Sequence, residues 1–255
     1  RRSRCSERPK SDRCSIDLPP NHDRPSESRN HPPGEVLAGG QLEDPTLDEE
    51  VQLAIRRVRR AKAVRPRQAK GLNKSYLDRF ITAQPATPWG VRNKSMLALG
   101  YEILARRSEL VALKQSDVEF RPDGTHQVLI PRSKADPFGN GRLAFTSPST
   151  SQLLNDWLEW RGGGQYLFCP IYRGKPIDRS LSATSVKRLI KSGAALAGVD
   201  PAEILMFSGH SMRVGAAQDL LIAGHDTAAI MRAGGWKSLA VLTRYLESAE
   251  HNVWA

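Results

Sequence analysis

Apolar residues recur at helical spacing over most of the chain beyond residue 44, and strand-like spacing is confined to its middle. The pattern predicts helices near residues 75–83, 90–105, 108–114, 150–160, 182–197, 210–223, 227–233 and 238–249. It also predicts three short strands at 118–120, 125–130 and 143–146. A Pro-Asp-Gly turn at 121–124 joins the first two strands, so they pair antiparallel. The order indicates a mostly α fold with a small antiparallel three-stranded sheet.

The first part of the chain has a different composition. Residues 1–43 are rich in Pro, Ser and Arg, and the first aromatic residue of the chain is Tyr76. Such a segment buries too little apolar surface to offset its ordering entropy, so we expect it to be disordered. Residues 44–72 are expected to form a basic helix and a linker, and residues 73–255 a compact domain.

The basic helix is predicted from a capping signal at its start and from the spacing of its apolar residues. Thr46 followed by Glu49 fits a capping box, and Val51, Ile55 and Val58 form one apolar stripe. Its other faces are basic, which is often only a solvated surface. The basic run continues through the linker, and we expect this segment to follow a phosphate backbone. The expected DNA contacts are Arg56, Arg57, Arg60 and Lys70.

Charge favours a polyanionic partner. The net charge is +11, but residues 1–50 carry 8 basic and 11 acidic residues, which leaves a net charge of +14 on residues 51–255. Nucleic acid or an anionic membrane surface would fit. No apolar run approaches about 18 residues and no signal-peptide pattern is present, so we expect a cytoplasmic protein without a membrane partner. Cys5, Cys14 and Cys169 show no metal-ligand spacing, and Cys169 is expected to be a buried strand thiol.

Tyr245 is the candidate nucleophile. Its phenol has a reference pKa of about 10, so it needs positive surroundings to attack at neutral pH. Considered alone, its spacing favours a place in the core, because its helix has regularly spaced apolar residues at Leu239, Val241, Leu242 and Leu246.

Several cations could serve a phosphate. Arg213 follows His210 by three residues, so both lie on one face at a helix start, where an anion is favoured. Arginine suits phosphate because its planar fork donates two parallel hydrogen bonds. The structural alternatives are an ion pair for Arg213 and a helix cap for His210.

Other candidates lie elsewhere in the chain. Arg106 precedes Glu109, which could orient it, and Arg107 is its rival for the phosphate. Lys134 lies in a predicted hairpin loop and could protonate a leaving oxygen, although such a lysine is usually only solvated. Trp236 offers an indole donor, and its alternative role is packing.

Taken together, the strings LARRSELVAL, PRSK, YLFC, SATS, SGHSMRVGAA, AGGW and RY occur in one order over roughly residues 50–249. They resemble the catalytic domain of the tyrosine recombinase (phage integrase) family. The resemblance implies the catalytic-domain fold of that family and site-specific cleavage and rejoining of DNA through a 3′-phosphotyrosyl link, without metal or nucleotide cofactor. The implied catalytic residues are Arg106, Lys134, His210, Arg213, Trp236 and Tyr245, with Glu109 in support.

The same resemblance implies double-stranded DNA and a homo-oligomer, a tetramer of two dimers, as partners. It also implies a nucleoid-associated protein of bacterial, phage or plasmid origin. Family members usually clamp DNA with a separate helical domain, of which residues 46–70 look like the last helix and linker. An inactive remnant is therefore an alternative.

Two further alternatives remain open. A type IB topoisomerase would share the Arg, Lys, His and Tyr chemistry. A non-enzymatic DNA-binding protein would use a helix-turn-helix with Gly224 in the turn, Arg232 and Lys237 on DNA, and Tyr245 in the core.

Overall fold

The computed structural model describes residues 48–62, 68–131 and 141–249. The chain divides into two compact units, Arg1–Val64 and Arg65–Ala255, which are described separately. The expected disorder of residues 1–43 lies outside the described residues, and the limits expected for the domains stay predictions.

The first unit contains helix α1, Glu49–Ala61. Its N-cap is Asp48, whose Oδ1 accepts the backbone N–H of Val51 at 3.0 Å. The predicted capping box, with Thr46 as N-cap and Glu49 as the third helical residue, is therefore wrong. The helix begins at Glu49, because the Asp48 carboxylate caps its free amides. None of its residues is buried, including the apolar stripe and the arginines at 56, 57 and 60.

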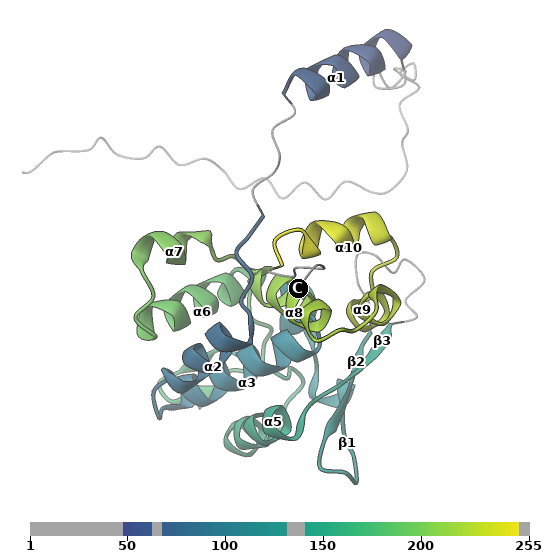
Figure 1. Ribbon diagram of the computed structural model, residues 1–255. Coiled ribbons are helices and arrows are strands. Elements are labelled where there is room, and N and C mark those ends of the chain that lie inside the picture. The colour runs from purple at the N-terminus through teal and green to yellow at the C-terminus, as the bar shows by residue number, and fades with distance from the viewer. Residues whose placement is uncertain (1–47, 63–67, 132–140, 250–255) are drawn as a thin grey trace, which may run out of the picture. The chain divides into compact units, whose positions relative to one another are not determined.

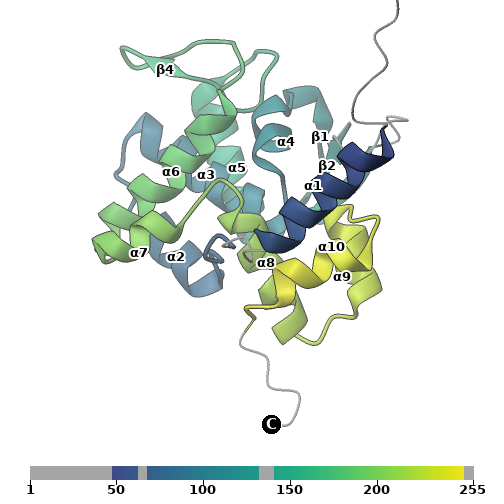
Figure 2. The same ribbon diagram turned by 90° about the horizontal axis from the view of Figure 1, so that it is seen from above.

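The second unit is mostly helical (Figures 1 and 2). Its helices are α2 Lys74–Thr82, α3 Pro88–Glu102, α4 Arg107–Ala112, α5 Pro148–Arg161, α6 Ala183–Leu196, α7 Pro201–Met206, α8 Ser211–Ile222, α9 Thr227–Gly234 and α10 Leu239–Leu246, with the 3-10 helix η2 at Gln115–Asp117. Side chains of Asn73, Thr87, Ser147, Asp200 and Asp226 accept the first amides of five of these helices, which explains where they begin.

A three-stranded antiparallel sheet lies beside these helices in the order β1 Val118–Phe120, β2 His126–Ile130 and β3 Arg142–Phe145. The register pairs Val128 with Ala144 and Ile130 with Arg142, so these four side chains share the inner face of the sheet. The predicted turn between β1 and β2 is confirmed: the Gly124 N–H donates to the Arg121 carbonyl at 3.0 Å, and Gly124 has a φ of +78°.

The fold class predicted from the sequence is confirmed, with a few short additions. The 3-10 helix η2, helix α7 and the two-residue strands β4 Ile171–Tyr172 and β5 Lys175–Pro176 were not predicted, because each is too short to show a period. Cys169 is fully buried as expected, but its backbone is irregular, so the predicted strand is wrong there.

The unit has one large hydrophobic core and a smaller satellite. In the large core, α3 packs between α5 and α8 (Figure 1). The satellite joins α8, α9 and α10 through Leu104, Ala217, Ile230, Trp236 and Leu242. Within the described residues, no helix has both the length and the apolarity needed to cross a membrane.

Candidate active site

Arg213 lies at the centre of the candidate site. It occupies the first turn of α8 and is 1% exposed. Its Nη1 donates to the carbonyl of Leu104 and its Nη2 to that of Gly234 at 2.7 Å. Leu104 has a left-handed φ of +47° in the turn between α3 and α4. The guanidinium is thus held by two segments that lie far from it in sequence.

Arg106 and Glu109 form the second element of the site. Arg106 is the N-cap of α4, where its backbone N–H donates to Glu109 Oε2 at 2.9 Å. Its Nη1 donates to Oε1 of the same carboxylate at 2.5 Å. The Arg106 side chain is 22% exposed and that of Glu109 only 2%. A buried carboxylate therefore holds an arginine that reaches the surface. Arg107, the rival for the phosphate, is more exposed.

Arg142 is a member of the site that the sequence reasoning missed. It begins β3 on the inner face of the sheet and is 13% exposed. Its Nη1 donates to the carbonyl of Ala233 at 2.7 Å, and its Nη2 to that of Ile103 at 2.8 Å. Nη2 also lies 3.4 Å from Glu109 Oε2. A charged residue at an inward strand position was the available signal, since such a position normally takes an apolar side chain.

Trp236 and Tyr245 stand against Arg213. The guanidinium carbon lies 3.8 Å from the centroid of the Trp236 ring and 5.9 Å from that of Tyr245. The two rings meet edge to face, with centroids 5.2 Å apart. Trp236 is buried and Tyr245 is half-buried at the last turn of α10. This contact places the tyrosine beside a fixed cation.

The backbone around the tryptophan is shaped to admit these side chains. A Cβ on Gly234 would lie 1.9 Å from Trp236 Cζ3, and one on Gly235 would lie 3.0 Å from Arg142 Cδ. Gly235 also has a φ of +66°, the left-handed conformation that ends α9. The two glycines of the AGGW string therefore leave the room in which Trp236 and Arg142 pack.

His210 completes the described part of the site. It is exposed and caps α8 without a side-chain cap hydrogen bond. Desolvation lowers its pKa, and the positive charges of Arg107, Arg213 and Arg106 lower it further. The imidazole therefore favours its neutral form beside these cations.

The charges of the site are unbalanced. The pKa of Arg213 is lowered to about 10, mainly by burial and also by the charges of Arg106 and Arg142, while Tyr245 and Glu109 act in the opposite direction. Burial also lowers the pKa of Arg142. Three guanidiniums share one carboxylate here, and an anion bound among them would reduce their mutual repulsion.

Two further predicted residues and the helix-turn-helix alternative remain to be placed. Lys134 is outside the described residues. Lys70 forms an ion pair with Glu203 at 3.1 Å and lies 5.2 Å from the Tyr76 ring centroid. For the helix-turn-helix alternative, Gly224 has a φ of +84° between α8 and α9, and Arg232 and Lys237 are exposed.

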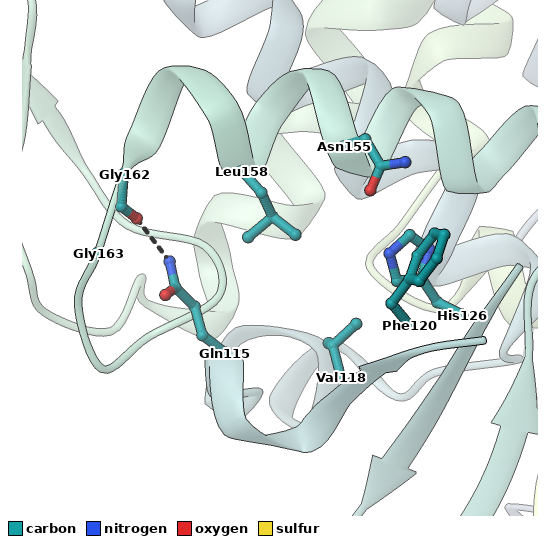
Figure 3. A pocket seen from close by; sticks show the side chains of 8 residues that line it. All are labelled: Gln115, Val118, Phe120, His126, Asn155, Leu158, Gly162 and Gly163. Carbon is teal, nitrogen blue, oxygen red and sulfur yellow. Dashed lines mark hydrogen bonds between the residues drawn. The ribbon is translucent and has the colours of Figure 1, made fainter. Parts of the chain in front are cut away.

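A pocket with none of these residues lies between η2, β1 and α5 (Figure 3). Its lining is Gln115, Val118, Phe120, His126, Asn155, Leu158, Gly162 and Gly163. Gln115 donates to the Gly162 carbonyl at 2.9 Å, and the Phe120 ring stands edge-on to His126. Burial lowers the pKa of His126.

Comparison with known proteins gives this arrangement a context. Residues 70–252 match the model of the phage integrase family. An integrase/recombinase XerD homolog of Selenomonas ruminantium is 32% identical over 168 residues, which cover 62% of this chain and 48% of that protein. Recombinase Cre of Escherichia phage P1 is 26% identical over 231 residues, which cover 84% of this chain and 67% of the relative. The matches thus span about half to two thirds of these relatives.

Solved structures share the fold. XerA recombinase superposes with a TM-score of 0.55 at 22% identity, over 72% of this chain and 61% of the other. A lambda integrase (75–356) dimer bound to a COC′ core site gives 0.56 at 19% identity, over 81% and 72%. The family model covers the whole span from Lys70 through the cation cluster to Tyr245, and the chain belongs to the phage integrase family.

Proposed function

We propose that this protein is a site-specific DNA recombinase that cleaves and rejoins strands through a 3′-phosphotyrosyl intermediate on Tyr245. The observation that carries the proposal is the position of Arg213, a buried guanidinium beside the rings of Trp236 and Tyr245 and close enough to Arg106 for that charge to lower its pKa. Membership of the family supports it. So does the resemblance in fold to recombinases whose structures contain their DNA sites.

In the proposed reaction, the Tyr245 phenol gives up its proton to water and its oxygen attacks the scissile phosphorus. The bond from phosphorus to the 5′ oxygen breaks, and that oxygen takes a proton and leaves as a hydroxyl. Lys134 is proposed as the donor of this proton. A 5′ hydroxyl from a partner strand then attacks the phosphotyrosyl link and restores the phenol, so that one phosphodiester is exchanged for another.

The cations act on the phosphate itself. The non-bridging oxygens gain charge as the phenolate adds, and donors already aimed at them lower the barrier. Arg106 and Arg213 are the proposed donors, with His210 and Trp236 beside them. Because neighbouring carbonyls, Glu109 and an aromatic ring already hold both arginines, little reorganisation is needed when the substrate binds.

The proposed substrate is double-stranded DNA, bound by an oligomer of two dimers. Arg56, Arg57 and Arg60 of α1 supply exposed positive charge for the phosphate backbone. Lys70 would add to this contact only after exchanging its partner Glu203 for a phosphate.

The test uses a DNA duplex nicked near the scissile phosphate, so that a short fragment diffuses away and the covalent complex accumulates. Wild-type protein should form this complex, and Tyr245→Phe should bind the duplex without forming it. Tyr172→Phe is the control, since Tyr172 is 62% exposed on the β4–β5 hairpin. A complex that persists in Tyr245→Phe would refute the assignment, and binding without any complex in the wild type would favour a non-enzymatic DNA-binding protein.

A further inference from the structure

Arg142 makes a set of contacts that its place in the sequence does not suggest. From the first residue of β3, its guanidinium reaches Ile103 at the end of α3, Ala233 in α9 and Glu109 in α4. It also lies 3.4 Å from the carbonyl oxygen of Leu104. One side chain thus links the sheet to three helical segments.

Arg213 holds the same two loops from the other side. It donates to Leu104 and Gly234, while Arg142 donates to the adjoining Ile103 and Ala233. Two guanidiniums therefore cross-link the α3–α4 turn to the end of α9. Loss of either guanidinium would loosen the two segments that hold the other, since the four acceptors lie in two pairs of consecutive residues.

Glu109 couples Arg142 to the second candidate phosphate ligand. Its Oε2 accepts from the Arg106 backbone N–H and lies 3.4 Å from Arg142 Nη2, while Oε1 accepts from Arg106 Nη1. The carboxylate is thereby held on both sides. Without Arg142, one side of this buried carboxylate would lose its cation, and the Arg106 side chain would lose part of its support.

Arg142 is placed to act through these groups and not on the phosphate. Its guanidinium contacts Ile103, Ala233 and Glu109, whereas that of Arg213 lies against the rings of Trp236 and Tyr245, the proposed nucleophile. The backbone is fitted around it, because a Cβ on Gly235 would approach Arg142 Cδ to 3.0 Å. The cost of burying this cation is offset by carbonyl oxygens and one carboxylate.

From this geometry we infer that Arg142 is a positioning residue, which sets Arg106 and Arg213 for the attack on the phosphate. The inference rests on the proposed function and deepens it, since it names the group that aligns the two cations. Lysine should not replace Arg142, because an ammonium is a point charge and cannot reach two segments with one planar fork.

The experiment measures single-turnover cleavage of the nicked duplex by wild type, Arg142→Met and Arg142→Lys. We expect both variants to cleave about 10–100-fold more slowly, the range seen for loss of supporting contacts around a site. Affinity for the uncleaved duplex should change less than about threefold, because Arg142 makes no contact with DNA in this account.

A second substrate separates positioning from general damage to the fold. It carries a methyl group in place of one non-bridging oxygen of the scissile phosphate, so less charge has to be neutralised. If Arg142 acts by aligning Arg106 and Arg213, the difference in rate between wild type and Arg142→Met should shrink on this substrate. A fold defect would slow both substrates equally, and that result would overturn the inference.

Arg161→Met is the matched control. Arg161 is another buried arginine that donates to carbonyls, those of Gly162 and Gly163, and pairs with Asp178 at 2.6 Å. Its loss should lower the melting temperature but leave cleavage by the folded protein unchanged. If Arg142→Met does not fold, Arg142→Gln keeps donors at the site and should show the same slow cleavage. If the folded Arg142 variants cleave as fast as the wild type, the positioning role is refuted but the proposed recombinase function stands. If the wild type forms no covalent adduct with DNA, both the positioning role and the proposed function are refuted.

Discussion

Glu109→Gln removes one charge from the site and keeps the shape of the side chain. The carboxylate is 2% exposed and serves three donors: the Arg106 backbone N–H at 2.9 Å, Arg106 Nη1 at 2.5 Å and Arg142 Nη2 at 3.4 Å. The amide oxygen of glutamine can replace one carboxylate oxygen, but its NH₂ group then faces a guanidinium donor.

The expected loss in the free energy of unfolding follows from these contacts. A hydrogen bond to a charged group contributes about 1.5–3 kcal/mol, and removal of one partner of a buried ion pair costs about 3–5 kcal/mol. Because Arg106 is partly exposed and glutamine keeps one acceptor, we expect a loss of about 2–4 kcal/mol in the free energy of unfolding. At about 2–4 °C per kcal/mol, the melting temperature should fall by roughly 4–16 °C.

Thermal and chemical unfolding followed by circular dichroism measure this loss. Glu119→Gln is the control, because Glu119 is an exposed carboxylate on β1 and should shift stability by less than about 0.5 kcal/mol. The double variant Glu109→Gln/Arg142→Met should lose less than the sum of the single variants, since each residue supports the other. A loss below about 1 kcal/mol in Glu109→Gln would show that the carboxylate does not hold the two arginines.

Three other changes test separate parts of the account. Gly234→Ala should cost about 1–3 kcal/mol of unfolding free energy, because the new methyl would lie 1.9 Å from Trp236 Cζ3; unchanged denaturation would contradict the packing. The folded-state pKa of His126 is lowered by burial, so its contribution to stability is complete above about pH 6.5 and is lost as the pH falls through the folded pKa, by at most about 1.4 kcal/mol per pH unit. His126→Gln should flatten this acid-side slope in urea unfolding, and equal slopes would argue against it. Replacing Arg57 and Arg60 with Ala should reduce the slope of log binding constant against log salt concentration by about 0.9 per lost phosphate contact. An unaltered slope in a titration from low to high salt would show that α1 does not contact the DNA phosphate backbone.

Local patterns in the sequence predicted most of the fold. Apolar spacing and capping residues place helices such as α3, α5 and α8 to within a few residues, because these signals lie inside the element itself. They fail where an element is short, as in α7, or where two capping residues compete, as Thr46 and Asp48 do before α1.

The candidate site needed a different kind of information. Family motifs pointed to Arg106, Arg213, Trp236 and Tyr245, and the structure brings these four side chains to one place. Arg142 escaped notice because its role depends on carbonyls that lie 39 and 91 residues away, on backbone that carries no side-chain signal. Only the folded chain shows which carbonyls turn toward a given arginine.

The most direct test of the central claim is to identify the residue that becomes attached to DNA. The covalent complex formed on nicked duplex is digested with protease and nuclease, and the peptide that carries the nucleotide is sequenced by mass spectrometry. We expect a phosphotyrosyl link on Tyr245, to the 3′ end of the broken strand. A link to any other side chain, or to the 5′ end, would contradict it.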